Sequence, residues 1–278
     1  MTEDVRYDGS LKASVILKDL APFVPALSRF EEPLDLNLVF SGHGKHLDCP
    51  TLRLTNHHGL MIAGEAALSN WDAGMDMYIY GKLGNLIMTK EGINVLMTNL
   101  TGKVPPILQR LDYIRFNGEA AGYLHDLTLT GLFHTGAGMV KTDVMMSIDE
   151  QSMSRTYSGS VASADLDLGK LLNQEKKFGK VDFNVELKGF NYKNRYPESY
   201  IKGIISSFEY SQYQYENIML DGVYKDGGFN GRLSMDDANG SVQIDGNFNV
   251  AKTIPDFNLK ASVKNLRPHD LHLSDKYE

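Results

Sequence analysis

Apolar and polar side chains alternate along much of this chain. In the segment SVQIDGNFNV, residues 241–250, the apolar side chains fall on every second position. They are Val242, Ile244, Phe248 and Val250, with Gly246 at the remaining position of the series. Successive side chains of a β-strand point to opposite faces of its sheet, so this segment predicts a strand with one apolar and one polar face. What the apolar face covers is the question that the sequence raises.

The same alternation recurs in segments separated by turn signals. Clear cases are residues 34–40, 51–55, 127–131, 181–189 and 257–263. Gly, Asn and Asp, as in DDANG (residues 236–240) and KDGG (residues 225–228), separate strands, and we expect a turn or bulge at Ser211 and Gln212. Helical spacing is confined to residues 20–30, 89–100 and 105–111. The pattern predicts a mainly all-β chain, an extended and curved antiparallel sheet with a few short helices.

A loose repeat runs through these segments. Strands that end in Asp-Leu or Asn-Leu finish at Leu20, Leu86, Leu166 and Leu266. Repeated groups of strands indicate one sheet whose units stack edge to edge, because a single unit cannot bury its apolar face. We therefore expect residues 1–278 to form a single repeat-built β region, with units at about residues 13–86, 87–166 and 167–266.

Alternation also selects the side chains of the apolar face. The candidates are Leu36, Leu38, Phe40, Leu127, Leu129, Phe183, Val185, Leu187, Val242, Ile244, Phe248 and Val250. The pattern leaves two interpretations open, because a closed sandwich or barrel core and an open groove both place apolar residues on one face. The short helix with Phe23, Leu27 and Phe30 would pack against this face or close its end.

Composition narrows the classes of partner. The 278 residues carry a formal charge of -7, with 42% hydrophobic and 23% charged residues. This balance argues against a nucleic-acid partner, since phosphates need a basic surface, and against electrostatic docking on anionic lipid. Cys49 is the single cysteine, which excludes an internal disulfide framework.

Catalytic and metal-binding signals are weak. His43, His46, His57 and His58 cluster in the sequence, but the spacings of zinc sites are missing, and we interpret them as solvated loop residues. Asp236 and Asp237 fit a hairpin turn, and Cys49 fits a small buried residue or a position at a strand edge. We expect no enzyme, no catalytic or metal site and no cofactor.

A tyrosine-rich stretch offers one further ligand hypothesis. Aromatic residues between Tyr192 and Tyr224 could bind a sugar, which would make the chain a carbohydrate-binding or carbohydrate-active β-protein. However, Phe208 with Tyr210 and Tyr213 with Tyr215 are spaced by two, as cross-strand aromatic pairs in a sheet are. The structural interpretation is favoured.

The ends of the chain carry no recognisable targeting segment. Residues 1–14 lack the apolar core of a signal peptide, and no apolar run has the roughly 18 residues of a spanning helix. The closing LHLSDKYE has no obvious stop signature, so we expect an internal fragment of a longer protein.

Two stretches resemble a known family. Residues 13–44 (ASVILKDLAPFVPALSRFEEPLDLNLVFSGHG) resemble the strand, short helix, strand and glycine turn of the AsmA-like superfamily. VASADLDLGKLL, residues 161–172, is similar to a recurrent phrase of its TamB-type (translocation and assembly module) branch. The recurring order of strands, short helices and glycine turns extends this resemblance over most of the chain. The resemblance includes no catalytic motif.

The resemblance implies a trough-like sheet, polar outside and apolar inside, that guides phospholipid between the inner and outer membranes and supports outer-membrane biogenesis. It implies a periplasmic segment of an inner-membrane-anchored protein, with the anchor absent from this chain, and an outer-membrane barrel assembly protein contacted through a missing C-terminal part. Phospholipid acyl chains would then be the partner. The alternative is an assembly module that pairs client β-strands, or a second copy, at a sheet edge.

Overall fold

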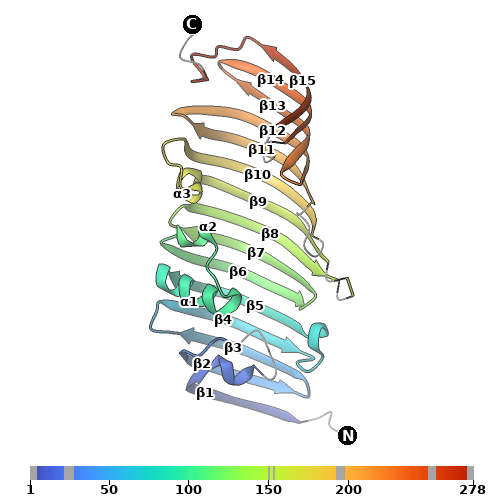
Figure 1. Ribbon diagram of the computed structural model, residues 1–278. Coiled ribbons are helices and arrows are strands. Elements are labelled where there is room, and N and C mark those ends of the chain that lie inside the picture. Colours follow the sequence, from blue (N-terminus) through green and yellow to red (C-terminus); the bar gives the residue numbers. More distant parts are fainter. Residues whose placement is uncertain are drawn as a thin grey trace. The chain divides into compact units, whose positions relative to one another are not determined.

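The computed structural model describes residues 5–21, 28–149, 151–152, 154–191, 198–249 and 255–273. The chain divides into two compact units, Met1–Gly136 and Ala137–Glu278. Both units are mainly antiparallel β-sheet, as the alternation predicts, and the few short helices lie mostly in the first unit (Figure 1). The predicted repeat boundaries differ from this division and stay a prediction.

In the first unit each strand pairs with the next along the chain. The strands are β1 (Arg6–Ile16), β2 (Pro33–His43), β3 (His46–Thr55), β4 (Leu60–Ser69), β5 (Tyr78–Thr89), β6 (Tyr113–Tyr123) and β7 (Asp126–Thr135). The helical pieces are η1 (Leu17–Leu20), η3 (Gly74–Asp76), α1 (Lys90–Thr101) and α2 (Pro106–Gln109).

The second unit follows the same rule. It contains β8 (Gly138–Ile148), β9 (Arg155–Asp167), α3 (Leu168–Leu172), β10 (Phe178–Asn191), β11 (Glu198–Tyr210), β12 (Tyr213–Lys225), β13 (Gly228–Asp237), β14 (Gly240–Asn249) and β15 (Asp256–Lys264). Among the described residues of each unit, the first and last strands do not pair with each other, so each sheet is open.

Several local predictions are confirmed. The helix expected over residues 89–100 is α1, whose N-cap Thr89 accepts a hydrogen bond from the backbone N–H of Gly92. Ser211 and Gln212 form the turn between β11 and β12, both with positive φ. Of the helix expected over residues 20–30, Phe23 and Leu27 lie outside the described residues, and Phe30 is buried.

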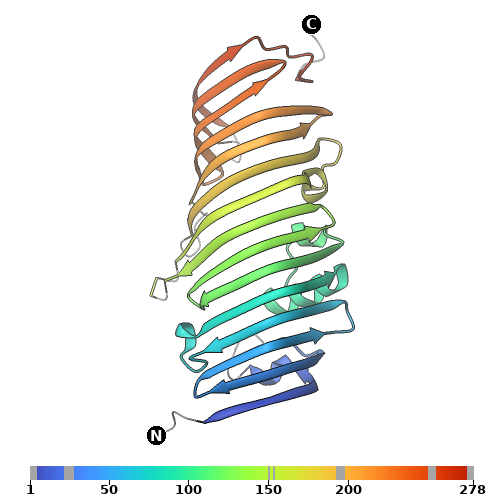
Figure 2. The same cartoon turned by 180° about the vertical axis from the view of Figure 1, so that it is seen from behind.

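Helices α1 and α2 lie over part of one face of the first unit. α1 and α2 lie in front of the strands in Figure 1 and behind them in Figure 2. α1 follows the end of β5 and contacts β5 and β6. Buried Leu60, Met88 and Ile114 form a cross-strand row at this end of the sheet, and Ile93 of α1 is buried as well. The compact core of the unit therefore sits where β5 ends and β6 begins.

The second unit has a core at the corresponding end of its strands. Tyr215, Ile218, Met235 and Leu271 form a buried cluster where β11 and β13 end and β12 and β14 begin. Leu271 belongs to a turn after β15, held by a hydrogen bond from the Tyr215 hydroxyl to its carbonyl oxygen at 2.7 Å. This turn covers only that end of the sheet.

A glycine row crosses the middle of the second unit. Gly222, Gly231 and Gly246 lie opposite one another on β12, β13 and β14. A Cβ atom at any of them would overlap backbone atoms of a neighbouring strand. Glycine is therefore required at these positions, because the backbones of the adjoining strands leave no room for a side chain.

Candidate functional site

The pairing register gathers the apolar residues of the first unit on one face. Directly opposite residues of an antiparallel pair point to the same side. Leu38 lies opposite Leu11 of β1 and Leu52 of β3, and Leu129 lies opposite Ala120 of β6. Leu36, Phe40 and Leu127 share this face at alternate positions of β2 and β7. The predicted candidates of this unit thus lie on one apolar face.

The second unit has an apolar face built in the same way. Val185 lies opposite Val161 of β9 and Gly203 of β11. Phe248 lies between Phe229 of β13 and Phe257 of β15, with the ring centroids of Phe229 and Phe248 5.5 Å apart. The other candidates on this face are Phe183, Leu187, Val242 and Ile244. Val250 lies outside the described residues.

All the described candidates are partly exposed. Each of them is intermediate between buried and exposed, whereas a closed core would bury such side chains. Fully buried side chains concentrate instead at the covered end of each sheet, at Ile93 and Leu271. The two sheets therefore present apolar surface that the described chain covers only in part. Their role as a lipid groove stays a prediction.

Charges of alternating sign cross the polar face of the second unit. In cross-strand register the row reads Glu186, Lys202, Asp221, Arg232, Asp245 and Lys260, on β10 to β15. The Nζ of Lys202 is 3.7 Å from a carboxylate oxygen of Asp221, and Arg232 is 3.3 Å from Asp245. We call this row the charge ladder. Opposite charges on facing positions favour this register.

The polar face is hollowed beside the charge ladder. A depression of about 760 Å³ is lined by most of the ladder together with Ile204 and Met219. Met219 is 54% exposed, and the residues opposite it on the adjoining strands are Ile204 and Ser234. Neither the ladder nor this hollow could be predicted from the sequence, because both become visible only when the register places distant residues side by side.

The tyrosine-rich stretch contributes to the core of the second unit. Tyr215 is buried, and burial raises the pKa of its hydroxyl. Tyr213 donates a hydrogen bond to Asp237, and its ring packs edge-on against Tyr215. These rings have partners within the fold, which supports the structural interpretation over a sugar platform. Tyr192 and Tyr196 lie outside the described residues.

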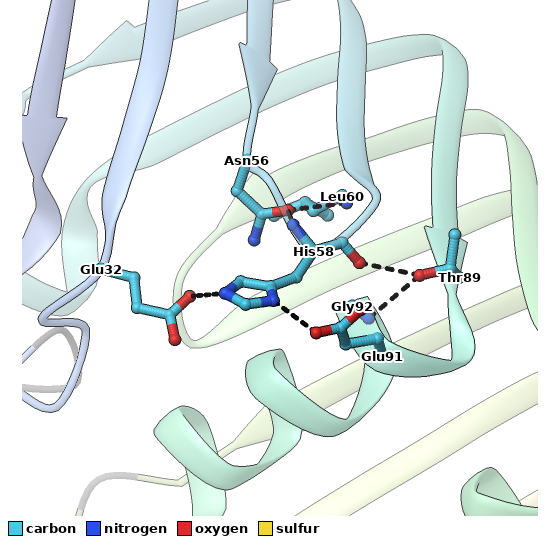
Figure 3. A network of polar contacts seen from close by, with 7 residues as sticks. All are labelled: Glu32, Asn56, His58, Leu60, Thr89, Glu91 and Gly92. Carbon is cyan, nitrogen blue, oxygen red and sulfur yellow. Dashed lines mark hydrogen bonds and ion pairs between the residues drawn. The ribbon is translucent and has the colours of Figure 1, made fainter.

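His58 lies in the turn after β3, in a loop as expected, and its partly exposed ring is held between two carboxylates. Its Nδ1 is 2.7 Å from Glu91 of α1, and its Nε2 is 3.0 Å from Glu32 (Figure 3). The hydrogen bond with Glu91 is the main cause that raises the pKa of His58. Thr89 donates a hydrogen bond to the carbonyl of His58 and caps α1. The network ties the turn after β3 to the start of α1.

The other candidate groups have structural surroundings. Cys49 is buried in β3, and burial raises the pKa of its thiol, which disfavours the nucleophilic thiolate. Asp237 accepts a hydrogen bond from the backbone N–H of Asn239 in the predicted turn. His46 contacts Ser69 and Asp48 at the start of β3. Among the described residues, no group of three His, Cys, Asp or Glu side chains is arranged to hold a metal ion.

Comparison of the chain with protein-family models, curated proteins and solved structures finds no match. None of the helices in the described ranges has the length and apolar character needed to cross a bilayer. The resemblance to the AsmA-like superfamily stays a prediction from the sequence.

Proposed function

We propose that the chain is a non-enzymatic structural segment whose apolar sheet faces carry phospholipid acyl chains. The observation that carries this proposal is the partly exposed apolar face of each unit. Leu38 in the first unit and Ile244 in the second lie within such faces, with apolar residues opposite them on both adjoining strands.

The energetics of lipid transfer favour such a surface. An acyl chain of roughly 16 carbons costs on the order of 12 kcal/mol to expose to water, at about 0.8 kcal/mol per CH₂. A row of partly exposed leucine, valine and phenylalanine side chains lowers this cost by contact alone. Transfer of this kind involves no covalent step, so the proposed function requires no catalytic group.

The resemblance to TamB-type proteins supplies the setting of the proposal. In that setting the chain is a periplasmic part of a bridge between the inner and outer membranes and supports outer-membrane biogenesis. The polar face, with the charge ladder, faces water, and the apolar face holds the lipid. The segments that cover one end of each sheet leave the rest of the face open to acyl chains.

Photocrosslinking tests the proposal. A photoreactive residue at Leu38 or Leu220, on the apolar faces, is expected to capture phospholipid in bacterial envelopes and in purified protein. Matched positions one residue away are Val39 and Met219, which point to the polar face and are 43% and 54% exposed. They are expected to capture little lipid, although they are exposed and apolar.

Equal lipid capture at both members of each pair would contradict the proposal, because capture would then follow exposure and not the face. Native mass spectrometry of the purified protein gives an independent measurement, in which co-purified phospholipid is expected.

A second candidate function is pairing with client β-strands at a sheet edge. The specific observation that favours it is β15, an exposed last strand with large apolar side chains on its surface. Edge pairing and lipid binding use different surfaces and do not exclude each other.

A further inference from the structure

Strand β15 has no partner along one of its two sides among the described residues. All nine residues of β15 are exposed, and within the described chain β15 pairs only with β14. On the apolar face, Phe257 is 60% and Val263 is 51% exposed. An edge strand offers a row of backbone N–H and C=O groups to another strand. We call the open side of residues 256–264 the β15 edge.

The sequence of β15 repeats that of β1. Residues 8–15 read DGSLKASV and residues 256–263 read DFNLKASV, so that Asp, Leu-Lys-Ala-Ser-Val and their spacing agree. Both strands place Leu, Ala and Val on the apolar face and Lys on the polar face. β1 has the partner strand β2, whereas the corresponding side of β15 has none among the described residues.

The pairing of β1 with β2 therefore indicates which strand fits the β15 edge. In that pair Leu11 faces Leu38, Lys12 faces Asn37, and Ala13 faces Leu36. Transferred to β15, Leu38 would face Leu259 and Asn37 would face Lys260. Val263 would face a residue like Leu34, and Phe257 a residue like Phe40, which would cover the two most exposed apolar side chains of the edge.

Charge adds a second, independent requirement. The charge ladder alternates in sign from Glu186 to Asp245 and ends on β15 at Lys260. The next position across the β15 edge therefore favours a carboxylate. β2 itself offers Asn37 there, so the ladder predicts that an acidic residue at this position pairs more tightly than asparagine.

We propose that the β15 edge binds an extended, antiparallel polypeptide strand with the alternating apolar pattern of β2 and an acidic residue opposite Lys260. The inference rests on the second candidate function, strand pairing, and does not depend on lipid transport. Main-chain hydrogen bonds supply the affinity, and the apolar positions and the acidic residue set the register.

The test uses the intact protein and fluorescent peptides with the sequence of β2, residues 33–43. The natural peptide, an Asn37→Asp version, an Asn37→Lys version and a scrambled peptide of the same composition are titrated by anisotropy. The aspartate peptide is expected to bind about two- to fivefold more tightly than the natural one, the range of an exposed ion pair, and the lysine peptide more weakly. The scrambled peptide is expected not to bind.

Charge reversal on the protein identifies the edge. Lys260→Glu is expected to invert the order, so that the lysine peptide binds most tightly. Lys188→Glu is the matched control, because Lys188 is exposed on the polar face of the internal strand β10. It is expected to leave the order unchanged. Peptides N-methylated at alternate residues test the main-chain bonds, since only one of the two alternate sets faces the β15 edge.

Three results would overturn the proposal. Equal binding of the natural and scrambled peptides would assign the edge to non-specific apolar adhesion. If the order of peptide affinities is unchanged in Lys260→Glu, the peptide binds at a surface other than the β15 edge. Self-association of the protein in sedimentation, abolished by Lys260→Glu, would assign the edge to a second copy. Lipid crosslinking at Leu38 and Leu220 is measured separately, so failure of either proposal is recognised on its own.

Discussion

Individual glycines of the sheet differ in whether their surroundings leave room for a side chain. A Cβ on Gly231 would overlap the carbonyl oxygen of Asp221 and the Cα of Gly222, whereas a Cβ on Gly81 would meet nothing within 4 Å. We expect Gly231→Ala to lower the free energy of unfolding by about 1–3 kcal/mol, because strands must move apart to admit the methyl group. Gly81→Ala, the matched control, is expected to be neutral or slightly stabilising. Urea unfolding measures both, and an equal loss in the two variants would contradict the steric argument.

His58 makes stability depend on pH. Its hydrogen bond with Glu91 raises its pKa above the ordinary 6.5, so the folded state favours the protonated ring. This stabilising contribution is fully present below the unfolded pKa and is lost as pH rises through the higher folded pKa. We expect the urea midpoint to fall between about pH 6 and about pH 8.

The control for this prediction is His58→Gln, which cannot titrate. It is expected to flatten the pH dependence in that window. A wild-type protein whose stability rises over the same window, or a variant with an unchanged slope, would contradict the assignment.

At the scale of elements, the turn after β15 depends on one side chain. Leu271 is fully buried in the cluster with Tyr215, whereas Leu273, two residues later, is exposed. Leu271→Ala is expected to cost about 2–5 kcal/mol, as for a leucine removed from a packed core. Leu273→Ala is the matched control and is expected to change stability by less than about 0.5 kcal/mol. Denaturant unfolding compares the two, and equal effects would contradict a core role for Leu271.

Strands, turns and α1 could be predicted because their signals are local. Period-two alternation marks β2, β10 and β14, and turn residues mark the ends of strands. Apolar Val39 and Met219 depart from the alternation, and the register places both on the polar face. The same alternation identifies which side chains lie on the apolar face.

Other features depend on residues that are far apart in the sequence. The charge ladder requires the register of six strands, and the His58 network joins Glu32, the turn after β3 and the start of α1. The division at residues 136 and 137 has no composition shift to mark it. These features depend on which distant segments pair in the folded chain, so the local sequence pattern does not predict them.

At the scale of the whole molecule, strand order within each unit equals chain order. Every described strand pair is therefore between strands that are consecutive in the chain, and several pairs, such as β2 with β3 and β13 with β14, are joined by a turn of two residues. Pairing of this kind needs little loop closure, and a hairpin can form before its neighbours do.

That ordering also makes size an adjustable property of the protein. Adding or removing one hairpin at an end of a sheet would lengthen or shorten it by two strands and leave the pairs among the other strands unchanged. The length of the apolar face can thus change during evolution in steps of two strands, while the existing strands keep their sequences.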